Sequence, residues 1–266
     1  LSKKISLVKK FIKLSKLRVV ELLLVTTIPS MIVSLYSMPP LTLVLSTLVG
    51  GTLLAVSANV MNQVFEIERD KLMQRTADRP LVTGELTKST GIGFSIITGI
   101  IGFATLYFLT TPTAAYIGLI ANQFYIFIYT LILKPRTNQN IVIGGAAGAA
   151  PVLIGWTATG STLDIGAWLL FLLVFMWTPA HFWALSIENK EDYKHADFPM
   201  LPTQESYERS TIYIAIYSCA TVLISLAVAP VLQLGIVYLL ISIFLGSNLM
   251  LKSFNLYKKN IKPIKY

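Results

Sequence analysis

Charged residues and cysteines are scarce in this sequence. Asp, Glu, Lys and Arg together make up 13% of its 266 residues, against about a quarter in soluble globular domains. The single cysteine, Cys219, excludes an internal disulfide and a cysteine-based zinc or iron–sulfur centre, and we expect it in the apolar core. These absences argue against a soluble protein and against a small disulfide-bonded one.

Long apolar segments make up most of the chain. Mean hydropathy is +0.66, and residues 22–65 and 89–133 contain no charged side chain. Runs of about 20 such residues are typical of membrane-spanning helices. We therefore predict an all-α, polytopic transmembrane helical bundle, with a basic amphipathic lead-in at 1–18, a transmembrane domain at 19–251 and a basic cytoplasmic tail at 252–266. Eight spans are expected, at 19–37, 41–64, 90–109, 113–133, 141–159, 165–187, 210–229 and 231–251.

Positive charge is confined to alternate connections between these spans. All 22 Lys and Arg residues lie in the N-terminal segment, the loops 65–89, 134–140 and 188–209, and the C-terminal tail. The four intervening loops contain none, and such an imbalance marks the cytoplasmic side. We expect an integral plasma-membrane protein with a cytoplasmic N-terminus. The net charge of +9 is explained by this topology, so no nucleic-acid partner is expected.

Three potential metal ligands lie at and just after the end of the second predicted span. In "NQVFEIERDKLMQRTADRP" (62–80), Asn62, Glu66 and Asp70 are spaced by four residues, which places them on one face of a continued helix. Such oxygen ligands suit Mg²⁺, which takes its remaining ligands from water and phosphate. The basic residues behind them, Lys71, Arg75 and Arg79, suit a diphosphate. The alternative is a solvated helix end crossed by ion pairs.

A second acidic stretch ends the sixth predicted span on the same side of the membrane. His181, Glu188 and Asp192 are spaced by seven and four residues, so they also share a helical face. Two acidic helix ends that face each other could hold metal ions around one diphosphate.

These stretches resemble the motifs of a known family. "NQVFEIERDKLMQRTADRPLVTGEL" is similar to the first aspartate-rich motif of the UbiA-type intramembrane prenyltransferases. "NIVIGGAAGAAPVLIGW" (140–156) and "WTPAHFWALSIENKEDY" resemble the protoheme IX farnesyltransferase (heme O synthase) branch. The sequence departs from the family in three ways: Glu66 replaces a usual Asp, His181 and aromatic residues open the second motif, and eight spans are expected where the family usually has nine. Whether a ninth span is missing stays open from the sequence.

The resemblance implies transfer of a farnesyl group from farnesyl diphosphate to a vinyl group of heme B, giving heme O for terminal oxidases. It implies Mg²⁺ as the cofactor, membrane lipid as surroundings and other membrane enzymes of heme biosynthesis as partners. Ionising an allylic diphosphate requires charge stabilisation and a water-poor, aromatic chamber. The expected catalytic residues are Asn62, Glu66, Asp70, Asp192 and His181, with Glu188 as a further metal ligand. The expected substrate-binding residues are Lys71, Arg75, Arg79, Tyr129, Lys134, Arg136, Phe182 and Trp183.

Other functions stay open from the sequence. A UbiA-type enzyme that acts on a quinone precursor or a lipid is the main alternative, although the "PAHFWAL" run argues against it. A transporter would need intramembrane charges near mid-span and repeated halves, whereas the acidic residues here cluster at span ends. Gly144, Gly145 and Gly148 either pack helices together or leave room for a flat macrocycle.

Overall fold

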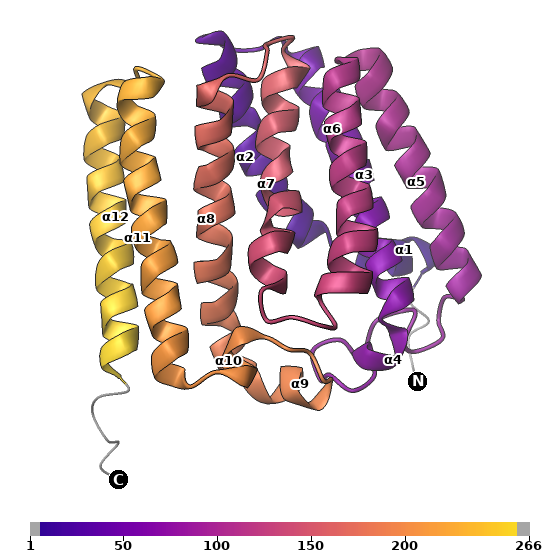
Figure 1. Cartoon of the computed structure of the whole chain (residues 1–266). Helices are drawn as coiled ribbons and strands as arrows, with labels where there is room; N and C mark the ends of the chain where they lie inside the picture. Colours follow the sequence, from indigo (N-terminus) through magenta and orange to yellow (C-terminus); the bar gives the residue numbers. More distant parts are fainter. Residues whose placement is uncertain (1–5, 260–266) are drawn as a thin grey trace.

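The computed structural model describes residues 6–259, except for the side chains of residues 17–24. Its long helices run side by side and form a bundle, and the short helices α4, α9 and α10 lie together at one end (Figure 1). The helices are α1 (Leu7–Ser15), α2 (Leu17–Leu35), α3 (Leu41–Phe65), α4 (Ile67–Asp70), α5 (Lys88–Leu109), α6 (Pro112–Gln123), η1 (Phe124–Leu133), α7 (Asn140–Ala158), α8 (Ile165–Glu188), α9 (Lys190–His195), α10 (Leu201–Gln204), α11 (Tyr207–Val231) and α12 (Gly235–Lys258).

The predicted spans correspond to long helices. Among residues 6–259, seven helices are long and apolar enough to cross a membrane, and they are α3, α5, the continuous pair α6–η1, α7, α8, α11 and α12. The first predicted span coincides with α2, and the described part of this helix, Val25–Leu35, is apolar. The all-α architecture of a multi-pass membrane protein is thus confirmed.

Polar residues begin several of these helices. The side-chain oxygens of Thr87, Thr111, Asp164 and Ser206 accept hydrogen bonds from the first turns of α5, α6, α8 and α11. Such caps satisfy backbone N–H groups that have no partner within the helix. They explain why these spans start where they do.

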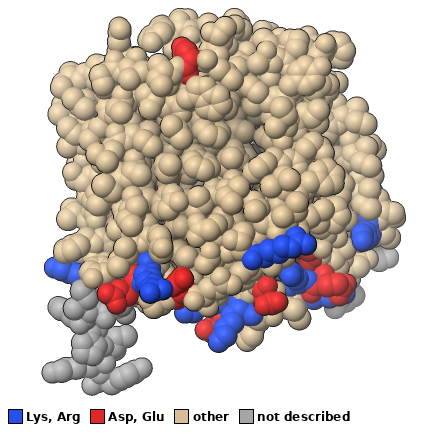
Figure 2. Space-filling model, viewed as in Figure 1, with Lys and Arg blue, Asp and Glu red and all other residues tan. Residues whose placement is uncertain are grey.

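Charged side chains gather at one end of the molecule. Figure 2 shows Lys, Arg, Asp and Glu over the end that contains α4, α9 and α10, while the middle of the viewed face carries none. Large apolar side chains cover the sides instead: Ile100 and Phe244 are 65% and 69% exposed. Cys219 is also exposed on α11, so the expected core position was wrong. An apolar exterior is what a lipid-embedded bundle requires.

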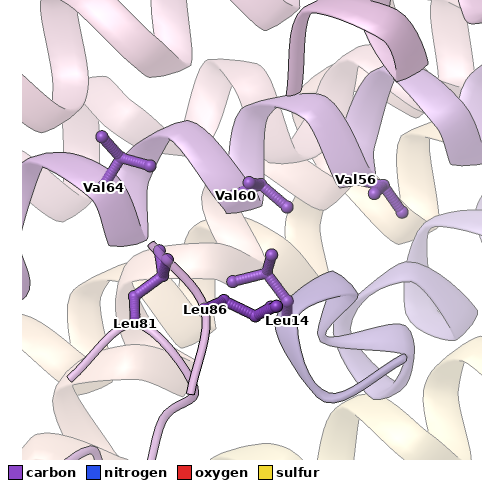
Figure 3. Close-up of a cluster of buried hydrophobic side chains, with 6 residues drawn as sticks. All are labelled: Leu14, Val56, Val60, Val64, Leu81 and Leu86. Atoms are coloured by element: carbon purple, nitrogen blue, oxygen red, sulfur yellow. The ribbon is translucent and has the colours of Figure 1, made fainter. Parts of the chain in front are cut away.

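Helix α1 is held against α3 by an apolar cluster. Leu14 is fully buried among Val56, Val60, Leu81 and Leu86, and Figure 3 shows it between the α3 side chains and the loop leucines. Leu7, Val8 and Ile12 of α1 are exposed. The apolar residues of α1 form one side of the helix and its lysines the other, which suits a helix at a membrane surface.

Salt bridges add a second connection between α1 and the loop before α5. The Lys13 ammonium lies 2.6 Å from the Asp78 carboxylate, and Lys10 lies 3.7 Å from Glu85. The chain then turns at Lys16, whose φ of 50° places it in the left-handed region. This turn directs the chain from α1 into α2.

Small residues allow the long helices to approach closely. At Gly102 of α5, a Cβ atom would lie 2.8 Å from the backbone nitrogen of Leu54 and 2.9 Å from the carbonyl oxygen of Gly50, both in α3. No larger residue fits there without moving a backbone, which is the usual reason for glycine between membrane helices. The close α3–α5 contact fixes the helix that carries the first acidic motif.

Candidate active site

A cavity of about 1340 Å³ opens between α1, α2, α3, α6–η1, α7 and α8. One end is charged and is lined by Lys16, Asn62, Glu66, Asp70, Arg75, Arg79 and Lys134. The interior is lined by small and apolar residues, among them Gly51, Ala55, Gly118, Ala121, Gly148 and Ile154. Most ligand pockets for one drug-sized molecule are about 300–1,000 Å³, so this cavity has room for more than one ligand.

The first acidic motif lines the charged end as the spacing predicts. Asn62, Glu66 and Asp70 are all buried and all face the cavity. Helix α3 ends at Phe65, but the N–H of Glu66 donates to the Asn62 carbonyl at 3.1 Å, and the N–H of Asp70 donates to the Glu66 carbonyl at 2.8 Å. The i→i−4 hydrogen bonds therefore continue through the break and keep the three side chains on one face.

Each carboxylate of the motif is paired with a cation that is largely shielded from solvent. The Arg79 guanidinium donates to the Asp70 carboxylate, and the Lys134 ammonium lies 2.6 and 2.7 Å from the two oxygens of Glu66. A buried charge is costly unless it is paired, so these ion pairs allow the site to exist within the protein. Arg75 also lines the cavity.

Two other predicted cations face away from the cavity. Lys71 pairs with the exposed Glu68 at 2.8 Å. The Arg136 guanidinium donates to the carbonyls of Leu131 and Ile132, at 2.7 and 3.2 Å, and so satisfies the end of η1. Both side chains are occupied by local contacts outside the cavity.

Lys16 belongs to the site and was missed in the sequence. Its ammonium lies 3.5 Å from the Asn62 carboxamide oxygen. Burial, together with the nearby Arg79 and Lys134 cations, lowers the pKa of Lys16 to about 7, against the opposing effect of the Glu66 and Asp70 carboxylates. The sequence pattern groups Lys16 with the surface lysines of α1, and no residue type there signals the left-handed turn that directs it inward.

A π-helix shapes the wall opposite α3. In η1, the N–H of Lys134 and the hydroxyl of Thr130 each donate to a carbonyl five residues earlier, at 2.8 Å. Such segments are rare and occur often at functional sites. Thr130 also accepts a hydrogen bond from the Asn62 carboxamide nitrogen at 3.2 Å, which leaves the Asn62 oxygen to face Lys16.

The same π-helix presents two aromatic rings to the cavity. The rings of Tyr125 and Tyr129 lie 5.0 Å apart and both line it. A Cβ atom at Gly144 would lie 2.3 Å from a ring carbon of Tyr129, so this glycine leaves space for the ring. Tyr129 was expected here, whereas Tyr125 was not.

The second acidic motif occupies a different place from the one predicted. Glu188 ends α8 and is exposed, Asp192 is half-buried on α9, and neither lines the cavity. The i→i−4 hydrogen bonds continue across Asn189, from its N–H to the Leu185 carbonyl at 3.3 Å and from the Tyr193 N–H to the Asn189 carbonyl at 3.2 Å. Asp192 nevertheless lies outside the cavity lining. Over residues 6–16 and 25–259, no group of three or more His, Cys, Asp or Glu side chains could hold a metal ion.

The two charged loops do meet, through aromatic and apolar contacts. Phe198 is buried and lines the cavity. Its ring centre lies 4.6 Å from the Lys134 ammonium and 4.9 Å from the Arg69 guanidinium carbon, and it packs with Met73 and Ala196. Cation–π contacts of this kind join the loop after α9 to the first motif.

The predicted residues of α8 divide between cavity and core. Phe182 lines the cavity. Trp183 does not: it is 1% exposed and packs edge-on against Tyr217 of α11, at 5.3 Å. His181 stacks on Trp177 with ring centres 4.4 Å apart, and it is Trp177 that faces the cavity.

The fold and the cavity define a class of protein: a multi-pass membrane protein whose helical bundle holds a cavity with a charged end and an apolar interior. The sequence profile of the UbiA prenyltransferase family matches residues 23–263, and the chain belongs to that family. The resemblance seen in the sequence is thereby confirmed.

Relatives and solved structures agree with this assignment. The protoheme IX farnesyltransferase of Paenarthrobacter aurescens is 44% identical over 251 residues, which are 94% of this chain and 78% of that protein. The protein of the same name from Parafrankia is 48% identical over 239 residues, 90% and 76% of the two chains. A UbiA homologue from Archaeoglobus fulgidus, solved with DMAPP and Mg²⁺, has a TM-score of 0.73 at 18% identity and covers 92% of this chain and 86% of its own. A digeranylgeranylglyceryl phosphate synthase structure has a TM-score of 0.77 at 20% identity, with 95% and 88% covered. At such identities the structures show the shared fold.

Proposed function

We propose that this chain transfers a farnesyl group from farnesyl diphosphate to a vinyl group of heme B (protoheme IX), giving heme O and releasing diphosphate. The observation that carries this proposal is the shape of the cavity, which joins a charged end to an apolar interior. The charged end suits a diphosphate, and the interior has room for a prenyl chain and a flat acceptor. The names of the relatives, at 41–48% identity, support heme as that acceptor.

Magnesium fits the donor set of the first motif. Asn62, Glu66 and Asp70 would supply one amide oxygen and two carboxylates, all buried on one face. Mg²⁺ is commonly bound by one or two carboxylates, with water and phosphate as the remaining ligands. When bound, the metal would stabilise negative charge on the departing diphosphate.

The cations around the motif are proposed to bind the diphosphate itself. Arg79 and Lys134 now neutralise Asp70 and Glu66, and they become available to phosphate oxygens when those carboxylates bind a metal ion. Arg75 and Lys16 line the same end of the cavity. Guanidinium groups bind phosphate through paired hydrogen bonds, and ammonium groups add charge.

The chemistry then takes place where the charged end meets the apolar interior. The bond between the first farnesyl carbon and the diphosphate oxygen breaks, and the electron pair leaves with diphosphate. The rings of Tyr125 and Tyr129 present π faces that stabilise the allylic cation. The apolar walls exclude bulk water, which would otherwise capture this cation before the vinyl group does.

The test is a reconstitution of the purified protein in lipid nanodiscs with Mg²⁺, farnesyl diphosphate and heme B. We expect heme O, identified by mass, and release of diphosphate. Parallel reactions contain a quinone precursor or a lipid acceptor in place of heme B. Prenylation of one of these, with heme B left unchanged, would refute the proposed acceptor.

We further propose that the charged end and the N-terminus face the cytoplasm, with the protein in the plasma membrane. All the lysine- and arginine-bearing loops lie at that end of the bundle. In a Cys219→Ser background, the Asn138→Cys variant should be labelled by a membrane-impermeant thiol reagent only in inside-out vesicles. Labelling of this variant in intact cells would show the opposite orientation and refute the proposal.

A further inference from the structure

Two carboxamides of α3 face the cavity and have no role in the reaction described so far. Asn59 and Gln63 are 6% and 1% exposed, and both line the cavity. The Gln63 nitrogen donates to the carbonyls of Leu14 and Asn59, at 2.6 and 3.1 Å. These bonds fix which end of the carboxamide is oxygen, and that oxygen is buried with no hydrogen-bond partner among the described residues.

The Asn59 backbone carbonyl accepts a hydrogen bond from Gln63, but its carboxamide makes none with the side chains and backbone that the structure describes, which exclude the side chains of residues 17–24. Buried polar groups almost always have a partner, in the protein or in ordered water. A bound water needs two to four polar partners. The Asn59 carboxamide and the Gln63 oxygen supply both donors and acceptors for one water molecule.

Their position along α3 places this water at the reacting atoms. Asn59 precedes Asn62 by three residues, a rise of about 4.5 Å along the helix. On the side of Asn59 away from Asn62, the walls become apolar at Ala58 and Ala55. The two carboxamides therefore lie where the charged end gives way to the interior, which is where the proposed prenyl transfer takes place.

We propose that Asn59 and Gln63 hold the water molecule that becomes the hydroxyl group of the product. This inference rests on the proposed function. The first farnesyl carbon bonds to the terminal vinyl carbon of heme B, and this leaves a cation on the inner vinyl carbon beside the pyrrole. The water oxygen donates an electron pair to that carbon, and its extra proton passes to an oxygen of the departing diphosphate. No oxidant or reductant takes part.

The carboxamides are positioning residues, because neither is a base at neutral pH. Without a positioned water, the same cation has another outcome. It loses a proton from the adjacent CH₂ group and becomes an alkene, so the product is prenylated but lighter by one water. The ratio of alcohol to alkene therefore reports on the water site, while the total of both reports on prenyl transfer.

The test is Asn59→Leu, which keeps the side-chain size and removes its hydrogen bonds. We expect the alcohol-to-alkene ratio to fall about tenfold, as loss of one to two neutral hydrogen bonds implies. Total prenylated heme should change much less. Asn59→Ser, whose hydroxyl can still bind water, should restore much of the alcohol. If Asn59→Leu does not fold, Asn59→Ala replaces it in the same measurement. Oxygen-18 water should label the wild-type hydroxyl.

Thr52→Val is the matched control. Thr52 lies on the same face of α3, seven residues from Asn59, and also lines the cavity; its substitution should leave the ratio unchanged. An unchanged ratio in Asn59→Leu or Asn59→Ala, with heme O still formed by the wild type, would overturn the water site alone. Failure of the wild type to form any prenylated heme would instead overturn the proposed function.

Discussion

Replacing Gly144 by alanine is expected to damage the site through Tyr129. The added Cβ atom would lie 2.3, 2.7 and 3.1 Å from three ring carbons, whereas carbon atoms in contact are about 3.5–4.0 Å apart. The ring must therefore move by about 1 Å. Overpacking of this kind costs about 1–3 kcal/mol of stability, and misplacement by about 1 Å at a reactive site can cost about 100-fold in rate. We expect kcat/KM for farnesyl diphosphate to fall by about 10- to 100-fold.

The assay combines thermal unfolding in detergent with steady-state kinetics, and the same helix offers a control. Gly148 also lines the cavity, but a Cβ atom there meets nothing within 4 Å. Gly148→Ala should keep stability or raise it by about 0.5–1 kcal/mol, the usual gain for alanine in a helix. In a Tyr129→Ala background, Gly144→Ala should cost little more, because the clash is gone. Equal losses from both glycine variants, or no relief in that background, would refute the reasoning.

Further predictions concern the charged end. Asp70→Asn should lower prenyl transfer by at least about 100-fold, because it removes a charged metal ligand, while the amide oxygen can still accept from Arg79 and the fold is kept; activity near wild type with Mg²⁺ would exclude Asp70 from the site. Lys16→Met should raise KM for farnesyl diphosphate by about tenfold, the value of one charged hydrogen bond, and leave KM for heme B unchanged. The hydrogen bond from Lys13 lowers the pKa of Asp78 below its usual 3.8, so the pair stabilises the fold above that pH and loses its effect as the pH falls through the lowered pKa. Asp78→Asn should therefore destabilise the protein at neutral pH by less than about 1 kcal/mol, and the difference from wild type should vanish at acid pH in thermal unfolding.

The multi-pass helical arrangement could be predicted from the sequence because two independent signals agree. The length of an apolar segment determines where a helix can cross a bilayer. The Lys and Arg residues lie in every second connection between the predicted spans. The i, i+4, i+8 spacing of Asn62, Glu66 and Asp70 likewise depends only on helix geometry, and it survives the break after Phe65.

The rest of the site depends on local departures from helix geometry, which residue types do not reveal. Lys16 lines the cavity because its own backbone is in the left-handed region. Tyr125 lines the cavity from within a π-helix. Asp192 was expected at the site from helical spacing, and it lies outside the cavity lining although i→i−4 hydrogen bonds continue across Asn189. Phe198 lies at the site because the loop after α9 packs against the loop that contains Met73, and these loops are far apart in the sequence.

The π-helical segment Phe124–Leu133 makes the cavity sensitive to chain length at one place. Each of its hydrogen bonds spans one residue more than in an α-helix, so the deletion of a single codon within it would let ordinary helical bonding resume. The flanking turns would keep their register, and residues within the segment would change the direction in which they face. One such deletion would replace Tyr125 and Tyr129 in the cavity wall by other side chains while the flanking helices stay in place. The cavity can therefore be remodelled by insertions and deletions as well as by point substitutions.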